Sequence, residues 1–152
     1  MKTWYLPIGF LVLGLLVSYY LGFTPVLVGV IYFFCSIVSY CLYAKDKWAA
    51  KNGHWRVQEN TLHISALVCG WPGAIIAQQG LRHKTQKASF RVVFVITLLL
   101  NLSLLGWLHT ADASQKLRHY INTADSWAVN QFGVNKGTTI LLALTKFHRQ
   151  GK

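Results

Sequence analysis

The stretch "CGWPGAIIAQQGLRHKTQKASF", residues 69–90, decides how this chain folds. It begins inside an apolar run, residues 62–81, that is about the right length to cross a bilayer. A proline in a helix interior removes a hydrogen bond, and flanking glycines weaken the helix further. Broken backbone is tolerated at membrane depth only where protein or water covers it. The run is therefore predicted to contain a covered helix break at Gly70, Trp71, Pro72 and Gly73.

The amino-acid composition indicates a membrane protein. Of 152 residues, 53% are hydrophobic and only 12% are charged, against about 25% charged residues in a soluble domain. Fifteen Lys and Arg face four Asp and Glu, so the protein attracts anions: phospholipid head groups, nucleic acid or an acidic partner. A second interpretation is only topological, because positive loops stay in the cytoplasm. The composition leaves both interpretations open.

Three other apolar segments are long enough to span a bilayer: residues 4–23, 25–44 and 92–110. Asn101 and Ser103, near the middle of the last one, are expected to face other helices. Residues 111–152 show apolar side chains at helical spacing among charged ones, as in an amphipathic helix on a membrane surface. The sequence thus predicts an all-α integral membrane protein with three spanning helices, one broken segment and C-terminal amphipathic helices. Its membrane domain would cover residues 1–110, followed by the tail.

The broken segment either spans with a kink or re-enters, turning at the break and returning to the same side. Loop charge distinguishes the two topologies if the amino terminus is cytoplasmic. Re-entry leaves nine Lys and Arg near the membrane inside and two outside, whereas spanning leaves seven and four. The positive-inside rule therefore favours re-entry, although the basic residues of the distal tail weaken the contrast.

Re-entry would gather two basic loops at one membrane face. The predicted anion site there consists of Arg56, Arg82, His83, Lys84 and Lys87. A structural polar cluster beside it would consist of Asp46, Lys47, Glu59 and Thr85. Thr85 is expected to cap the next helix, and a helix amino terminus surrounded by cations binds phosphate groups. In the alternative interpretation, Asp46 and Glu59 only hold the two loops together by pairing with cations.

No catalytic or metal centre is predicted, and no cofactor is expected. Cys35, Cys41 and Cys69 lie in apolar segments without a metal-binding spacing, and the six His form no ligand pair. The sequence contains neither a nucleophile elbow nor a P-loop. The residues that remain available for acid–base chemistry are Asp46, Glu59 and His83.

The charged residues follow the pattern of a known family. Residues 40–105 resemble the YsdA-like family (DUF1294) of small bacterial membrane proteins, a family without an established function. The matching residues are Asp46-Lys47, Arg56, Glu59, Leu62, Gly70, Gly73, Arg82-His83-Lys84-Thr85, Lys87 and Phe90. The departures are Val57-Gln58 for Ile-Pro, Cys69 for Gly and Leu81 for Phe. Some family members carry a cold-shock domain, so the resemblance implies a weak link to nucleic acid.

The sequence supports three hypotheses for function. The first is a binding or scaffolding protein of the bacterial inner membrane, whose basic cytoplasmic face engages an anionic lipid head group or an acidic partner. The second is an accessory subunit of a larger membrane complex, or a homo-oligomer, in which the tail contacts a partner protein. The third is a membrane enzyme that acts on a lipid or another phosphate-bearing substrate.

Overall fold

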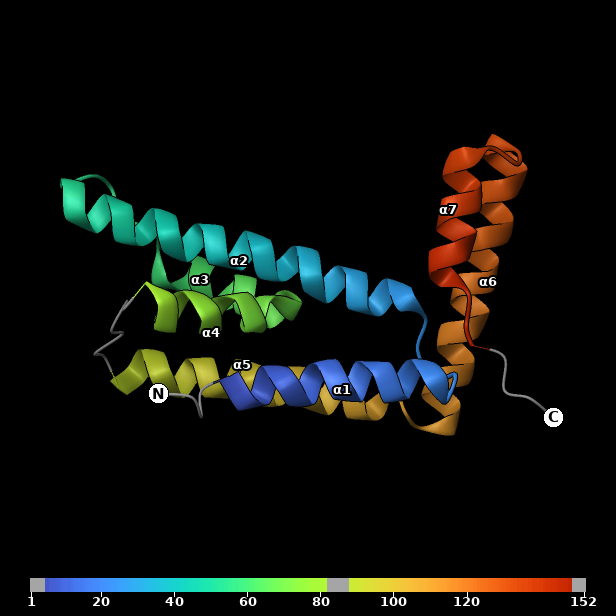
Figure 1. Cartoon of the computed structure of the whole chain (residues 1–152), viewed down its shortest axis with the longest axis horizontal. Helices are drawn as coiled ribbons and strands as arrows, with labels where there is room; N and C mark the ends of the chain where they lie inside the picture. Colours follow the sequence, from blue (N-terminus) through green and yellow to red (C-terminus); the bar gives the residue numbers. More distant parts are fainter. Residues whose placement is uncertain (1–4, 82–87, 149–152) are drawn as a thin grey trace. The chain divides into compact units, whose positions relative to one another are not determined.

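The described residues of the computed structural model, 5–81 and 88–148, contain helices and no strand. The helices are α1 (Leu6–Tyr20), α2 (Val26–Asn52), α3 (Glu59–Ser65), the π-helical turn η2 (Ala66–Gly70), α4 (Trp71–Gly80), α5 (Ala88–Trp107), α6 (Ala111–Phe132) and α7 (Lys136–Thr145) (Figure 1). Residues 1–11 and 30–103 pack as a first compact unit, and residues 12–29 and 104–152 as a second. The all-α prediction is confirmed.

Three helical segments are long and apolar enough to cross a membrane. They are Val26–Asn52, Glu59–Gly80 and Ala88–Trp107, with mean hydropathies of 2.1, 1.2 and 2.1. The first predicted span, residues 4–23, is represented by α1, which is apolar but only 15 residues long. The second predicted span ends later than expected, because α2 continues through the charged residues 45–52.

The distribution of side chains in these segments is typical of a protein surrounded by lipid. Large apolar side chains such as Phe33 and Leu99 are exposed, at 63% and 56%. Polar side chains such as Ser39 and Thr97 are buried between helices, at 0% and 6% exposure. A water-soluble protein has the opposite arrangement. The chain is therefore an all-α membrane protein, with its polar groups turned inward.

The first arm of the broken segment runs antiparallel to α2. Before α3 begins, the backbone N–H of Val57 donates to the Asp46 carboxylate at 3.1 Å. At the end of α3, the hydroxyl of Ser65 lies 3.2 Å from that of Ser39. Residue numbers thus rise along α3 while those of the contacted residues of α2 fall.

The second arm returns along the same helix. Gly73, near the start of α4, lies against the backbone of Ser36, and the Gln78 amide donates to the Tyr43 hydroxyl at 3.3 Å. Residue numbers now rise together in both helices. Residues 59–80 therefore form a helical hairpin beside α2, with both of its ends toward the end of α2 (Figure 1).

The chain reverses at Val68 and Cys69, directly before the predicted break. Their backbone angles are not helical, and Cys69 adopts the left-handed conformation with φ 60° and ψ 4°. Pro72 lies in the first turn of α4, where a missing N–H costs no helical hydrogen bond. Thus Pro72 begins the second arm of the hairpin rather than kinking a continuous helix.

Gly70 and Gly73 let the second arm approach α2 closely. A Cβ atom on Gly73 would lie 2.5 Å from the Ser36 carbonyl carbon and nearer still to its oxygen. One on Gly70 would lie 2.8 Å from the Cys35 carbonyl oxygen. Only a residue without a side chain fits at such distances. The neighbouring Trp71 is consequently fully buried.

A side chain of α5 covers the break. Asn101 donates from its amide nitrogen to the Leu67 carbonyl oxygen at 2.8 Å, and its amide oxygen accepts from the Tyr32 hydroxyl at 3.5 Å. Asn101 is only 4% exposed, so its predicted orientation toward other helices is confirmed, whereas Ser103 is exposed. Asn101 thus supplies a side-chain donor to a backbone carbonyl directly before the reversal.

Candidate functional site

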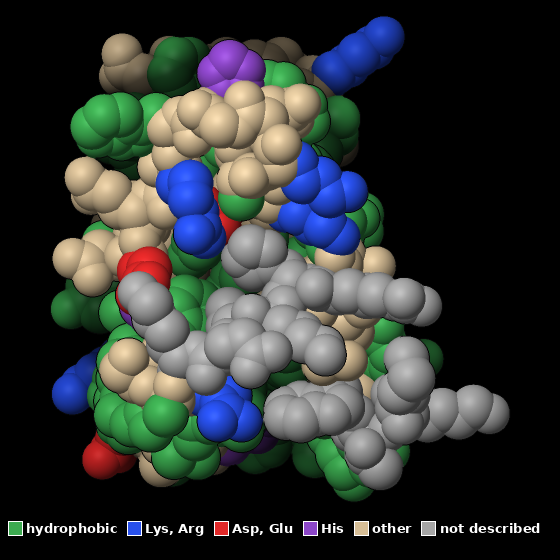
Figure 2. Space-filling view, turned by 90° about the vertical axis from the view of Figure 1, so that its left-hand side faces the viewer, with side chains coloured by type: hydrophobic (Ala, Val, Ile, Leu, Met, Phe, Trp, Pro, Cys, Tyr) green, Lys and Arg blue, Asp and Glu red, His purple; other side chains and the backbone are tan. Residues whose placement is uncertain are grey.

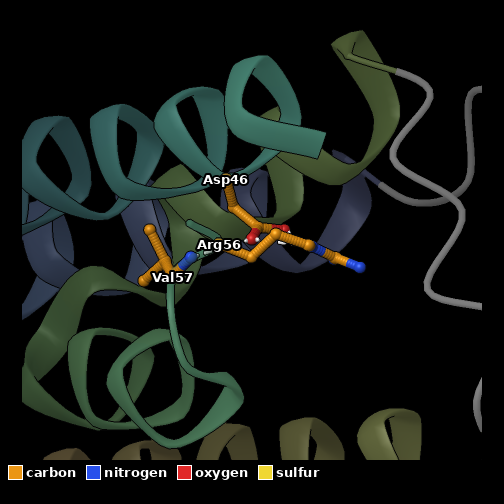
Figure 3. Close-up of polar contacts among 3 residues, drawn as sticks. All are labelled: Asp46, Arg56 and Val57. Atoms are coloured by element: carbon orange, nitrogen blue, oxygen red, sulfur yellow. Dashed lines mark hydrogen bonds and ion pairs between the residues drawn. The ribbon is translucent and has the colours of Figure 1, made fainter. Parts of the chain in front are cut away.

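The candidate site lies at the base of the hairpin, which we define as Asp46, Lys47, Arg56, Val57 and Leu81. Asp46 belongs to α2 and is 1% exposed. Its carboxylate accepts from the Arg56 guanidinium at 3.2 Å and 3.0 Å through two nitrogens, as well as from the Val57 N–H (Figure 3). A buried carboxylate needs such partners because burial removes its hydration. Asp46 thus fixes the chain where it enters the hairpin.

The Arg56 side chain is 60% exposed, so one side of its guanidinium contacts Asp46 while much of the group faces solvent. The hydrogen bonds that Arg56 donates to Asp46, and then the charge of Asp46, raise the pKa of Arg56 above its already high usual value, and the charge of Glu59 adds to this effect. Arg56 therefore remains cationic and holds a fixed position. Its first role is structural, as the alternative interpretation of the sequence predicts for this pair.

Lys47 holds the opposite end of the hairpin. Its ammonium group donates to the Leu81 carbonyl oxygen, just after α4 ends. Terminal carbonyls of a helix lack helical donors, and a Lys side chain is a favourable partner for them. Two consecutive residues of α2 thus secure both ends of the hairpin, since Asp46 binds the incoming chain and Lys47 the outgoing chain.

Glu59 lies in the first turn of α3 and is exposed there. A carboxylate in this position stabilises the positive end of the helix dipole. Glu59 thus lies next to Arg56 and Val57 in the chain that Asp46 fixes, close enough to act on the charge of Arg56. Asp46, Lys47, Arg56 and Glu59 therefore lie close together, and because all four fall within residues 46–59, their proximity does not depend on how the following segment runs.

The other predicted anion-binding residues, Arg82, His83, Lys84 and Lys87, lie outside the described residues, as does Thr85. Their sequence nevertheless follows Leu81 directly, and Leu81 is part of the hairpin base. Further exposed cations, Lys45 and Lys51, stand on the last turns of α2. Figure 2 shows Lys and Arg side chains gathered beside a carboxylate on this face. The described part of the site thus presents the exposed cations Lys45, Lys51 and Arg56 beside one buried acid, Asp46, and one exposed acid, Glu59.

The contacts of two structural residues, Lys47 at the hairpin base and Ser36 beside Gly73, could not be assigned from the sequence. The role of Lys47 depends on a carbonyl 34 residues away, so no local pattern indicates it. Ser36 provides the surface that Gly73 contacts. A signal for this contact exists, because Ser36 and Ser39 are small residues one helical turn apart in an otherwise bulky span.

The described residues contain no group of three or more His, Cys, Asp or Glu that could hold a metal ion. At the hairpin base, Asp46 already accepts three hydrogen bonds. The chemistry that the described side chains offer is recognition of anions by fixed cations.

Comparison with known proteins places this hairpin in a shared region. The model of a protein family of unknown function, DUF1294, matches residues 36–90. The uncharacterized protein YsdA of Bacillus subtilis (strain 168) is 34% identical over 61 residues, which are 40% of this chain and 68% of that protein. No solved structure matches the chain. The matched stretch contains the hairpin and its base, and α6 and α7 lie outside it.

Proposed function

The chain belongs to the DUF1294 family, and from this premise we propose a membrane-embedded binding or scaffolding protein. Its hairpin base, together with the basic residues 82–87 that follow Leu81, binds the phosphate of a phospholipid head group. The related YsdA protein comes from a bacterium, and we assign the chain to the bacterial cytoplasmic membrane, with this basic face toward the cytoplasm.

The first step of the proposal is that the hairpin is re-entrant. By residue count Glu59–Gly80 is long enough to cross a membrane, but that length applies only to a straight helix. The hairpin follows α2 from Asp46 to Ser36 and back, a depth of about 15 Å at 1.5 Å per residue. This is roughly half of a hydrocarbon core. Half of the residues in its most apolar window are buried, against 17% in α2 and 22% in α5, as expected for a segment covered by protein.

The observation that carries the function is the pairing of Asp46 and Lys47 with the two ends of the hairpin. Because both ends are held at one place, the exposed Arg56 and Leu81, which the basic residues 82–87 follow in the sequence, belong to the same face. Asp46 compensates one cation there, whereas Lys45, Lys51, Arg82, Lys84 and Lys87 bring further positive charge. Such a surplus attracts phosphate groups, and each Lys or Arg near an anionic membrane contributes about 1 kcal/mol.

The test measures binding of phosphatidylglycerol to the purified full-length protein by native mass spectrometry over a range of salt concentrations. Replacing Arg82→Ala and Lys84→Ala together removes two cations, so binding is expected to weaken by about 2 kcal/mol, roughly thirtyfold. Added salt should reduce this difference by screening. The control is Lys116→Ala with Lys136→Ala, which removes the same charge from exposed positions of α6 and α7.

The proposal requires that the control variant bind phosphatidylglycerol as the wild type does. If the Arg82 and Lys84 variant also bound like the wild type at every salt concentration, the anion site would be disproved. If both double variants weakened binding equally, only the net charge of the protein would matter, and a specific face would likewise be excluded.

A further inference from the structure

The second unit contains a cavity of about 310 Å³ between α6 and α7 that lies outside the family-matched stretch. Its lining residues come from both helices and the segment after α7: Arg118, Asn122, Asp125, Leu142, Thr145, Lys146 and Phe147. A volume near 300 Å³ is at the small end of ligand sites. It accommodates a head group but not an entire phospholipid.

Two of the three charged groups that line this cavity, Asp125 and Arg118, are held by contacts within the second unit. The Thr145 hydroxyl donates to the Asp125 carboxylate at 2.9 Å. The Arg118 guanidinium lies 4.5 Å above the Phe147 ring and donates to the Gly22 carbonyl. The contact with the ring is a cation–π interaction. These contacts orient one acid and one cation before any ligand binds, which reduces the entropy cost of binding.

The α6–α7 pair that forms the cavity has a side-chain cap at the start of each helix. Thr110 caps the start of α6, and Asn135 forms a capping box with Thr138 at the start of α7. Such caps satisfy N–H groups that have no helical partner. Residues 118, 122 and 125 of α6 lie on one face because they are about one turn apart. The cavity thus belongs to a rigid pair of helices.

The charges select the ligand class. Arg118 and Lys146 present two cations, and Asp125 presents one anion beside them. A phosphate alone would meet the carboxylate as well as the cations. A group that carries both a phosphate and an ammonium would use all three, with the phosphate toward the cations and the ammonium toward Asp125. Leu142 and Phe147 supply an apolar surface for the ligand's carbon atoms, which lie between the phosphate and the ammonium and beyond them.

The α6–α7 pair that forms this cavity follows a membrane-length helix in the chain. α6 begins at Ala111, shortly after the membrane-length helix α5 ends at Trp107. Trp127 and Phe132 of α6 are 62% and 61% exposed, and Trp in particular is enriched at membrane interfaces. We propose that the α6–α7 cavity binds a phosphoethanolamine group, as in the head group of phosphatidylethanolamine.

The test compares binding of phosphatidylethanolamine, phosphatidylglycerol and phosphatidylcholine to the full-length protein by native mass spectrometry. Asp125→Asn keeps an acceptor for Thr145 but removes the negative charge, so it should weaken phosphatidylethanolamine binding about tenfold and leave phosphatidylglycerol binding unreduced. Lys146→Gln should weaken phosphatidylethanolamine binding as well. Lys136→Gln, an exposed site at the start of α7 that does not line the cavity, is the matched control and should change neither.

A second arm identifies the source of the group. Soluble phosphoethanolamine, titrated against the protein in detergent, should compete with the lipid if the head group alone is recognised. Binding of the soluble compound without lipid binding, still lost in Asp125→Asn, would assign the site to a free phosphoester. The proposal is overturned if neither form binds, or if Asp125→Asn and Lys146→Gln bind phosphatidylethanolamine as Lys136→Gln does. The Arg82 and Lys84 variant should bind phosphatidylethanolamine normally, which separates this outcome from the function proposed above.

Discussion

Replacing Gly73 with alanine should destabilise the protein, although a glycine-to-alanine change usually strengthens a helix. The new Cβ would lie 2.5 Å from the Ser36 carbonyl carbon and 2.7 Å from its Cα. Ordinary contact begins near 3.4 Å, so α4 and α2 must separate by about 1 Å or more. The atoms it meets belong to the backbone of a helix and cannot rotate away.

The size of the effect follows from two opposed terms. Alanine gains about 1 kcal/mol over glycine in an open helix position. Overpacking of a close interface costs about 1–3 kcal/mol or more, and here it also disturbs the buried Trp71 and Ala74 beside the contact. The matched control is Gly80→Ala in the same helix, where a Cβ meets nothing within 4 Å. Because both variants gain the helix term, we expect Gly73→Ala to be less stable than the control by the overpacking cost alone, about 1–3 kcal/mol.

The assay is reversible unfolding in detergent micelles, followed by the fluorescence of the tryptophans, of which Trp71 is fully buried at the contact. Gly73→Ala should unfold at lower denaturant than wild type, and Gly80→Ala at the same or higher denaturant. Equal stability of the two variants would refute the close approach of α4 to α2, and with it the path of the second arm.

Three further substitutions test the hairpin in the same assay. Asn101→Leu removes the donor to the Leu67 carbonyl and should cost about 1–3 kcal/mol, while Ser103→Leu, at an exposed position, should be neutral; equal effects would contradict the covering role. Cys69→Gly should stabilise by about 1 kcal/mol, because glycine adopts the left-handed conformation freely; a loss of stability would count against that backbone. Asp46→Asn should cost about 1–3 kcal/mol through its weakened bonds to Arg56, and an unchanged midpoint would show that the pairing contributes nothing.

The existence of the hairpin could be anticipated from the sequence, but its turning point could not. Pro72 between two glycines indicates a break, and loop charge favours a return to one side. The reversal at Val68 and Cys69 depends on a backbone angle that cysteine rarely adopts. The family pattern places glycine at position 69, and the left-handed conformation now gives the physical reason.

The carboxyl-terminal end of α2 was harder to predict, because the last turns of this helix contain charged residues. Charged residues after position 44 resemble a loop when hydropathy alone is considered, yet α2 continues to Asn52. In this stretch Asp46 pairs with Arg56, as one interpretation of the sequence allows, and Lys47 has a partner far along the chain in the Leu81 carbonyl. Such long-range contacts override local patterns, and only the structure reveals them.

The most direct test of the central claim is sided labelling of single cysteines with a membrane-impermeant maleimide. The cysteines replace Asn52 and Gly80, both exposed, in a chain without Cys35, Cys41 and Cys69. Intact cells and inside-out vesicles give the two sides. The account predicts that positions 52 and 80 are labelled from the same side, the cytoplasmic one. Labelling from opposite sides would mean that residues 59–80 cross the membrane, and it would contradict both the re-entrant hairpin and the single basic face.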